Sequence, residues 1–216
     1  VLSMLVIIPK TSMAAGSGWS MTISKKTSLT VGEEIYVNAT NLNNTHKYYI
    51  QIENESGDFV NITTDPATPR KPTDGEIHLK IHIPYRKPGS YELRLVDQTN
   101  SSYLNDTIQI QNMYKVEFAV EGETVEYVIW NKVYEDFKVY VKNWTGSKYE
   151  LLDENVTVEI REPDGTLLES ETITEGTFTT DIKFNFTDGD NKETDHYVLV
   201  KKNSDVVANV TLPVLL

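Results

Sequence analysis

Residues 31–41 read VGEEIYVNATN, and apolar and polar side chains alternate along this stretch. Ile35, Val37 and Ala39 fall on one side of an extended chain, and the residues between them fall on the other. Successive side chains of a β-strand point to opposite faces, so this alternation is typical of a strand with one buried face. The stretch therefore predicts a strand of a sheet that covers a core.

The same alternation recurs about every ten residues from Trp19 onward, and no stretch has helical periodicity. Turn residues separate the runs, most clearly in Glu162-Pro163-Asp164-Gly165. The predicted strands are Ser20–Ser24, Ile35–Thr40, Tyr48–Glu53, Phe59–Thr63, Glu76–Ile83, Tyr91–Val96, Tyr103–Ile110, Lys115–Val120, Thr124–Trp130, Phe137–Lys142, Asn155–Glu162, Thr166–Ile173, Thr177–Phe186, His196–Lys201 and Val206–Leu212. The pattern predicts an all-β chain of sandwich type.

The length of 216 residues is sufficient for two domains, and the charge distribution suggests where they divide. Residues 19–112 contain 9 Lys and Arg against 11 Asp and Glu, whereas residues 113–216 contain 10 against 21. We therefore expect an apolar segment and linker over residues 1–18, a first domain over 19–112 and an acidic second domain over 113–216. The net charge of −12 and the absence of a basic stripe argue against nucleic acid as a partner.

The chain contains no cysteine, which excludes disulfides, thiolate metal sites and cysteine catalysis. Exported eukaryotic domains of this size usually carry disulfides, so a cysteine-free exported chain favours a prokaryotic surface, such as an archaeal one.

Residues 31–41, together with PGSYELRL at residues 88–95, resemble the B and F strands of immunoglobulin-like (Ig-like) domains in archaeal and bacterial surface proteins. Tyr91 occupies the position of a tyrosine-corner residue. The resemblance covers residues 19–112 and, more loosely, 113–216. It implies two tandem Ig-like β-sandwich domains. With its apolar N-terminal segment the chain is also similar in plan to subunits of archaeal surface threads, which are joined by donor strands, and to surface-layer components.

The N-terminal segment VLSMLVIIP, residues 1–9, has two interpretations. An apolar run followed by small residues is typical of a signal peptide, and it is too short for a transmembrane span, which needs about 20 residues. Nine extended residues, at about 3.3 Å each, also reach the length of a sandwich strand. A strand of this kind could complete the sheet of another copy. The intersubunit donor residues would then be Val1, Leu2, Met4, Leu5, Val6, Ile7 and Ile8.

Ten Asn-x-Ser/Thr acceptor sites stand out, because composition alone would give about three. They are Asn38, Asn43, Asn54, Asn61, Asn100, Asn105, Asn143, Asn155, Asn185 and Asn209. Asn38, Asn155, Asn185 and Asn209 alternate with apolar neighbours, which places them on the polar face of predicted strands, where a glycan is tolerated. The sequence therefore predicts an N-glycosylated, secreted cell-surface protein. The competing interpretation is that a β-protein rich in Asn and Thr contains such sites incidentally.

Catalytic and metal-binding patterns are missing from the sequence, so we expect a protein that is not an enzyme and has no cofactor. His78 and His82 share one face of a predicted strand, but they would lie about 13 Å apart, too far for one ion. The acidic loop with Asp188, Asp190 and Asp195 is a weak candidate for Ca²⁺. No triad, phosphate loop or carboxylate pair can be assigned. Trp130 is expected in the core, and carbohydrate recognition by tryptophans is a weak alternative.

These features favour a structural subunit of a filament or surface array whose partners are copies of itself. The contacts would use the N-terminal segment or the apolar tail Leu212–Leu216. The alternative is a monomeric adhesin or ligand-binding module whose N-terminal segment is removed as a signal peptide.

Overall fold

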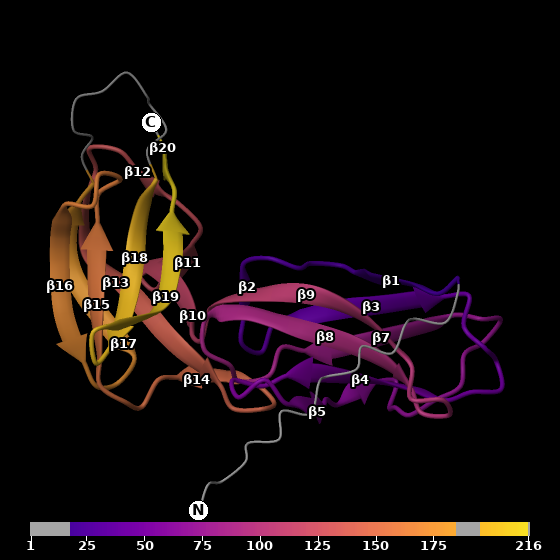
Figure 1. Cartoon of the computed structure of the whole chain (residues 1–216). Helices are drawn as coiled ribbons and strands as arrows, with labels where there is room; N and C mark the ends of the chain where they lie inside the picture. The colour runs from indigo at the N-terminus through magenta and orange to yellow at the C-terminus, as the bar shows by residue number, and fades with distance from the viewer. Residues whose placement is uncertain (1–17, 185–194, 216) are drawn as a thin grey trace, which may run out of the picture. The chain divides into compact units, whose positions relative to one another are not determined.

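The computed structural model describes residues 18–184 and 195–215, and every regular element in these ranges is a β-strand (Figure 1). The predicted all-β fold is confirmed. In chain order the strands are β1 (Ser20–Ile23), β2 (Leu29–Thr30), β3 (Glu34–Thr40), β4 (Tyr48–Glu53), β5 (Phe59–Asn61), β6 (Thr64–Asp65), β7 (Ile77–His82), β8 (Gly89–Asp97), β9 (Tyr103–Asn112), β10 (Lys115–Val120), β11 (Glu123–Val125), β12 (Val128–Ile129), β13 (Val133–Trp144), β14 (Tyr149–Leu151), β15 (Val156–Arg161), β16 (Leu167–Ile173), β17 (Thr177–Lys183), β18 (His196–Lys202), β19 (Asp205–Leu212) and β20 (Val214–Leu215).

The chain divides into two compact units. Unit 1 comprises the residues up to Ser24 together with Ile35–Ile81 and Glu92–Thr107. Unit 2 comprises Lys25–Glu34, His82–Tyr91 and the residues from Ile108 onward.

The strands up to β9 form two sheets with the orders β1-β3-β7-β6 and β2-β9-β8-β4-β5. In chain order this is the A-B-E-D and G-F-C arrangement of an Ig-like sandwich. The alternation in β3 is the one predicted, because Ile35, Val37 and Ala39 are buried and the residues between them are not. Leu79 and Ile50, on strands of the two different sheets, are buried in the same way.

Tyr91 has the hydrogen bond that a tyrosine corner requires. Its hydroxyl donates to the carbonyl oxygen of Lys87, four residues upstream, at 2.8 Å. Such a bond from strand F back to the preceding turn is characteristic of Ig-like sandwiches. The sequence-based interpretation of Tyr91 is therefore confirmed.

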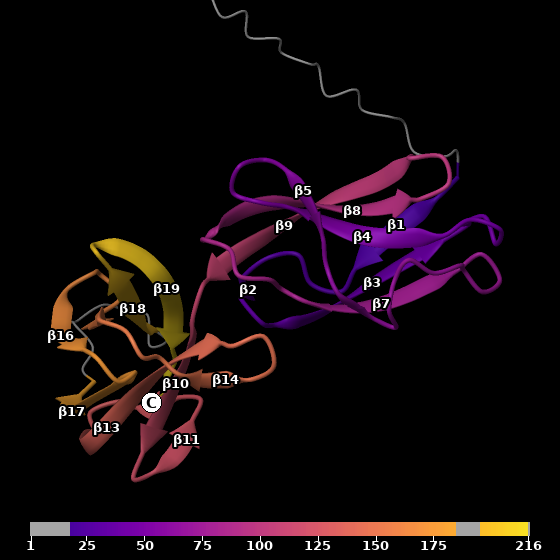
Figure 2. The same ribbon diagram turned by 90° about the horizontal axis from the view of Figure 1, so that it is seen from below.

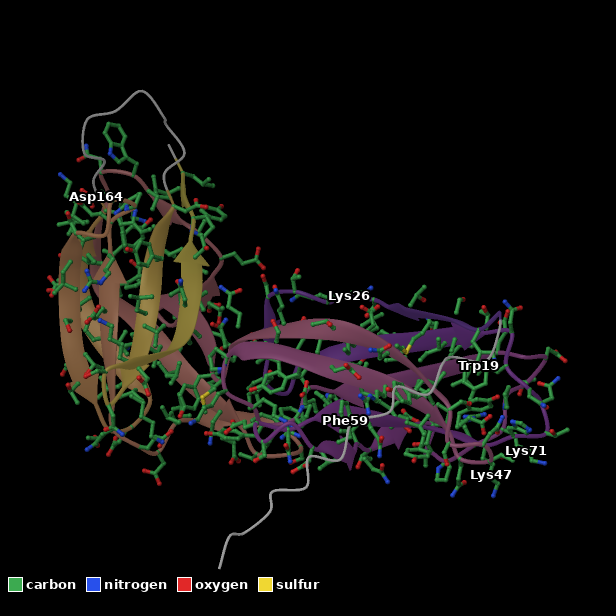
Figure 3. The ribbon with its side chains drawn as sticks, in the orientation of Figure 1. Trp19, Lys26, Lys47, Phe59, Lys71 and Asp164 are labelled. Carbon is green, nitrogen blue, oxygen red and sulfur yellow. The ribbon has the colours of Figure 1, made fainter. Side chains whose placement is uncertain are left out.

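The remaining strands form a second sandwich-like pair of sheets (Figure 2). One sheet has the order β16-β15-β18-β19, and in the other β13 pairs with β10, β14 and β17. The predicted turn after β15 is present, since the Gly165 amide donates to the Glu162 carbonyl at 2.9 Å. Figure 3 labels Asp164 in this turn, at one end of the sheet.

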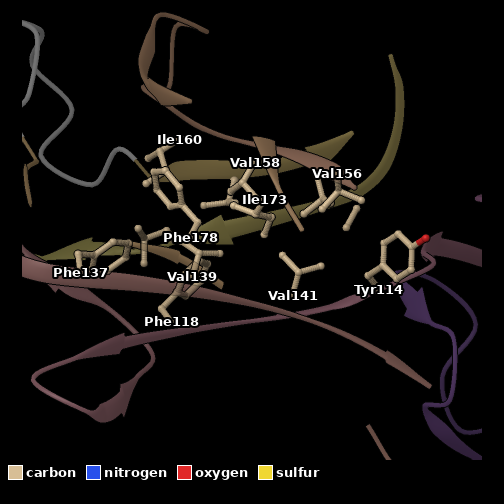
Figure 4. Close-up of a cluster of buried hydrophobic side chains, with 14 of the residues drawn as sticks. Tyr114, Phe118, Phe137, Val139, Val141, Val156, Val158, Ile160, Ile173 and Phe178 are labelled. Carbon is tan, nitrogen blue, oxygen red and sulfur yellow. The ribbon is translucent and has the colours of Figure 1, made fainter. Parts of the chain in front are cut away.

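The core of unit 2 lies between these two sheets (Figure 4). Phe137, Val139 and Val141 on β13 face Val158 and Ile160 on β15, and all five are fully buried. From Phe137 to Val141 every second residue of β13 is buried, as the alternation of side chains in a strand requires, and a bulge between Tyr134 and Phe137 shifts this phase earlier in the strand.

One predicted strand is wrong in its detail. The run Thr124–Trp130 is divided into β11 and β12 by a bend at residues 126–127. The strand β12 ends at Ile129 and Trp130 lies in the turn that follows, so Trp130 is 42 % exposed and is not a core residue.

Candidate functional site

The acceptor asparagines are distributed over both units and lie outside the cores. Asn43, Asn61, Asn100, Asn105, Asn155 and Asn209 are exposed, and Asn38, Asn54 and Asn143 are partly exposed. Asn185 lies outside the described residues. The described members are therefore positioned where a glycan would extend into solvent.

Several acceptor side chains of unit 1 are already hydrogen-bonded through the amide oxygen. Asn38 Oδ1 accepts from His78 Nδ1 at 2.9 Å. Asn54 Oδ1 accepts from the backbone amides of Ser56 and Asp58, both at 2.9 Å. Asn61 Oδ1 accepts from Gln51 Nε2 at 3.1 Å. These bonds orient the side chains through the amide oxygen. They do not involve the amide nitrogen, which is the atom that would carry a glycan.

Asn100 differs because its amide belongs to a buried polar cluster. Asp97 at the end of β8 is fully buried, and its Oδ2 lies 2.7 Å from Nδ1 of His46. The Thr99 backbone amide donates to Asp97 Oδ1 at 2.8 Å. With the Asn100 amide oriented so that donors face acceptors, Nδ2 donates to Asp97 Oδ2 at 2.8 Å. Figure 3 labels Lys47, which follows His46 in the loop before β4.

No sequence pattern indicated this cluster, because its two loops lie about fifty positions apart in the chain. On the side away from Asp97, His46 Nε2 lies 3.3 Å from Asn43 Nδ2. Asn43 Oδ1 in turn accepts from both the backbone amide and the hydroxyl of Thr45, at 2.9 and 2.8 Å. The imidazole thus bridges a buried carboxylate and a side-chain amide, which is a structural arrangement rather than the nucleophile–base pair of a hydrolase.

His78 and His82 take part in separate contacts. His78 bonds Asn38, while the His82 ring stacks on Trp144 at a centroid distance of 5.1 Å. Within the described ranges, no group of three His, Asp or Glu side chains is placed to hold a metal ion. Asp195 is exposed, but Asp188 and Asp190 lie outside the described residues, so the Ca²⁺ candidate stays a prediction.

The predicted donor segment, Val1 to Ile8, also lies outside the described residues. In the part of the chain that the structure describes, no helix is long and apolar enough to cross a membrane.

An exposed apolar patch surrounds the short two-stranded sheet of β12 and β20, which pair in parallel with Ile129 opposite Leu215. We call it the β12–β20 patch. Its members, all large side chains at least 38 % exposed, are Tyr127, Ile129, Trp130, Val133 and Leu215. Exposed apolar side chains gathered in this way are typical of a surface that contacts another molecule.

Glu159 on β15 anchors a charged network on the other sheet of unit 2. Its Oε1 accepts from Lys201 Nζ and its Oε2 from Arg161 Nε, both at 2.7 Å. Burial raises the pKa of Glu159, but the hydrogen bonds and charges of Lys201 and Arg161 outweigh this effect and hold the pKa below its ordinary value.

A carboxyl group with a lowered pKa in the folded state stabilises the fold above its ordinary pKa, and this contribution is lost as the pH falls below about 4.3. We expect Glu159→Gln to lower the free energy of unfolding by about 1–3 kcal/mol at pH 7. We also expect it to flatten the loss of stability between about pH 5 and 3. Urea denaturation across this range measures both effects. Glu171→Gln, at an exposed position on neighbouring β16, is the control. Parallel stability curves for Glu159→Gln and the wild type would contradict the assignment.

No protein-family model matches the sequence, and no curated protein matches it. Among solved structures, the chain is similar to the BSP domain of a biofilm-associated protein, with 11 % identity over 89 % of this chain and 29 % of that chain, at a TM-score of 0.30. It is similar to the D0-D1 domain of intimin, with 14 % identity over 91 % and 98 % of the two chains, at a TM-score of 0.34. It is also similar to a DUF4785 family protein from Legionella pneumophila, with 8 % identity over 90 % and 55 %, at a TM-score of 0.41. The chain thus spans under a third of the first of these structures.

Proposed function

We propose that this chain is an extracellular, N-glycosylated structural protein without enzymatic activity. In this proposal it is a subunit of a cell-surface filament, and its partners are copies of itself and N-linked glycans. Each subunit inserts its apolar segment Val1–Ile8 into the next by donor-strand complementation.

The observation that carries this proposal is the distribution of the acceptor asparagines. Nine of the ten lie in the described residues, in both units, and all nine are at least partly exposed. Glycans at most of these positions would cover broad areas of the sheets and leave few faces for a flat partner. Contacts between copies are then directed toward the N-terminal segment and toward apolar surface that carries no acceptor.

The β12–β20 patch is an exposed apolar surface, and it supports a contact in unit 2. Its side chains are apolar, like those of Val1–Ile8. Burying apolar area stabilises an association by about 25 cal/mol per Å². An apolar strand held by such a patch would also be protected from aggregation.

Deleting residues 1–9 is expected to give folded subunits that no longer polymerise, because the donor strand is removed. Size-exclusion chromatography with light scattering and negative-stain electron microscopy measure particle size, and circular dichroism checks the fold. Leu5→Asp with Ile7→Asp should have the same effect, because two charges in an apolar strand oppose its burial.

Ser3→Ala keeps the segment apolar and is the matched control, which should assemble like the wild type. Filaments that form without residues 1–9 would refute donor-strand assembly. A mature N-terminus at or after Ala14, found by sequencing protein from the cell surface, would favour a monomeric adhesin or a surface-layer component.

A further inference from the structure

We infer that Asn100, although it is exposed and lies in an acceptor sequence, carries no glycan, because its amide nitrogen is held by the buried carboxylate of Asp97 in a clasp formed by Asp97, His46 and Asn100. This inference rests on the proposed glycosylation only for its contrast with the other acceptor sites. The clasp itself is a property of unit 1.

The carboxylate of Asp97 has no exposed surface and therefore depends on protein donors. Three donors surround it, namely Nδ1 of His46 at 2.7 Å, the backbone amide of Thr99 at 2.8 Å and Nδ2 of Asn100 at 2.8 Å. Removing one donor leaves a buried carboxylate incompletely hydrogen-bonded, which is costly. Asn100 is thus part of the structure that keeps Asp97 buried.

The clasp also joins two segments of the chain. His46 precedes β4, and Asp97 and Asn100 lie at the turn between β8 and β9. Backbone bonds reinforce the junction, because the Gln98 amide donates to the Lys47 carbonyl at 2.8 Å and the Ser101 amide to the Asp97 carbonyl at 2.9 Å. The position of Asn100 is therefore fixed from both sides.

Attachment of an N-linked glycan uses the atom that the clasp occupies. The reaction forms a bond between Nδ2 and the anomeric carbon of the sugar. One Nδ2 proton and the phosphate leaving group of an activated lipid-linked donor depart. At Asn100, Nδ2 lies within 3.3 Å of three atoms, namely both carboxylate oxygens of Asp97 and Nδ1 of His46. These three atoms therefore lie against the side of Nδ2 that points to Asp97.

Three other acceptors of unit 1 use the opposite end of the amide, whereas Asn43 uses both ends, since its Nδ2 lies 3.3 Å from Nε2 of His46. At Asn38, Asn54 and Asn61 the amide oxygen makes the hydrogen bond. Asn105 is exposed on β9, a few residues after Asn100 in the same hairpin, and it is the natural control.

Glycopeptide mass spectrometry on protein taken from its native cell surface tests the modification. We expect glycan at Asn105 and none at Asn100. Glycan on Asn100 overturns the inference. If no acceptor site carries glycan, the proposed glycosylation is refuted, and the clasp is then judged by stability alone.

The stability arm uses unglycosylated protein made in bacteria. Asn100→Ala is expected to lower the melting temperature of unit 1 by about 4–8 °C, and Asn105→Ala by about 1 °C or less. When Asp97 is already replaced by Asn, Asn100→Ala should lower the melting temperature much less, because the buried charge that requires the donor is gone. The clasp would be contradicted if Asn100→Ala and Asn105→Ala lowered the melting temperature equally. It would also be contradicted if Asn100→Ala lowered the melting temperature by the same amount in the wild type and in Asp97→Asn.

Discussion

Replacing Gly176 by Ala is expected to lower the free energy of unfolding by about 3 kcal/mol, because a methyl group there meets backbone atoms that cannot move aside. The added Cβ would lie 2.6 Å from the Leu152 nitrogen and 2.7 Å from the Val141 oxygen. The Val141 amide donates to the Gly176 carbonyl at 2.7 Å, and the Leu152 amide to the Val141 carbonyl at 2.9 Å. Relieving the clash would break these bonds. In addition, the φ of +65° is unfavourable for any residue with a Cβ.

Gly122→Ala separates the clash from the backbone strain. Gly122 has a φ of +84°, and no heavy atom lies within 4 Å of its added Cβ. We therefore expect Gly122→Ala to lower the free energy of unfolding by about 1 kcal/mol, because of the left-handed backbone alone. Urea denaturation followed by circular dichroism compares the two variants. If the two variants lost similar free energies of unfolding, the clash of the added Cβ with the backbone at Gly176 would not be what destabilises the fold.

The sequence predicted the longer strands well because each has one buried face. Tyr48–Glu53 and Lys115–Val120 match β4 and β10 at both ends. Four of the strands of two or three residues were missed, namely β2, β6, β14 and β20. Such segments are too short to show alternation. They are strands only because a distant segment lies beside them, as β9 does for β2.

Trp130 shows where alternation fails as a guide to burial. The run Thr124–Trp130 has the composition of one strand, but the chain bends at residues 126–127 and β12 then pairs with β20 in parallel. Val128 is buried, but β12 ends at Ile129 and Trp130 lies in the turn that follows, where alternation no longer applies. A tryptophan expected in the core therefore lies in the exposed β12–β20 patch.

The acceptor sites show what a three-residue motif leaves out. Asn100 and Asn105 both satisfy it, and both lie on the surface. The difference between them is that Asn100 contacts the buried carboxylate of Asp97, which is also bonded to His46, 51 positions earlier in the chain. The motif identifies a chemically competent side chain, whereas the tertiary structure decides whether its nitrogen is already in use.

Phe137→Ala is expected to be the most destabilising single truncation in unit 2, with a loss of about 4 kcal/mol. Phe137 is fully buried, and its ring lies 5.4 Å from that of Phe184 and 6.2 Å from that of Phe118, measured between centroids. The substitution removes these ring contacts as well as buried apolar area and leaves a cavity between the two sheets. A loss of this size is a large fraction of the stability of about 5–15 kcal/mol that is usual for a domain.

Val133→Ala on the same strand is the matched control, because Val133 is 59 % exposed and its truncation should cost less than about 0.5 kcal/mol. Urea denaturation followed by near-ultraviolet circular dichroism, which reports aromatic packing, measures both variants. The position in β13 decides the difference, since Phe137 points into the core that β15 covers (Figure 4), whereas Val133 is an exposed member of the β12–β20 patch. A similar small loss for both variants would mean that the aromatic cluster does not stabilise unit 2. If only Phe137→Ala lowers the free energy of unfolding, Val133 in the β12–β20 patch can be substituted in assembly experiments without unfolding the subunit.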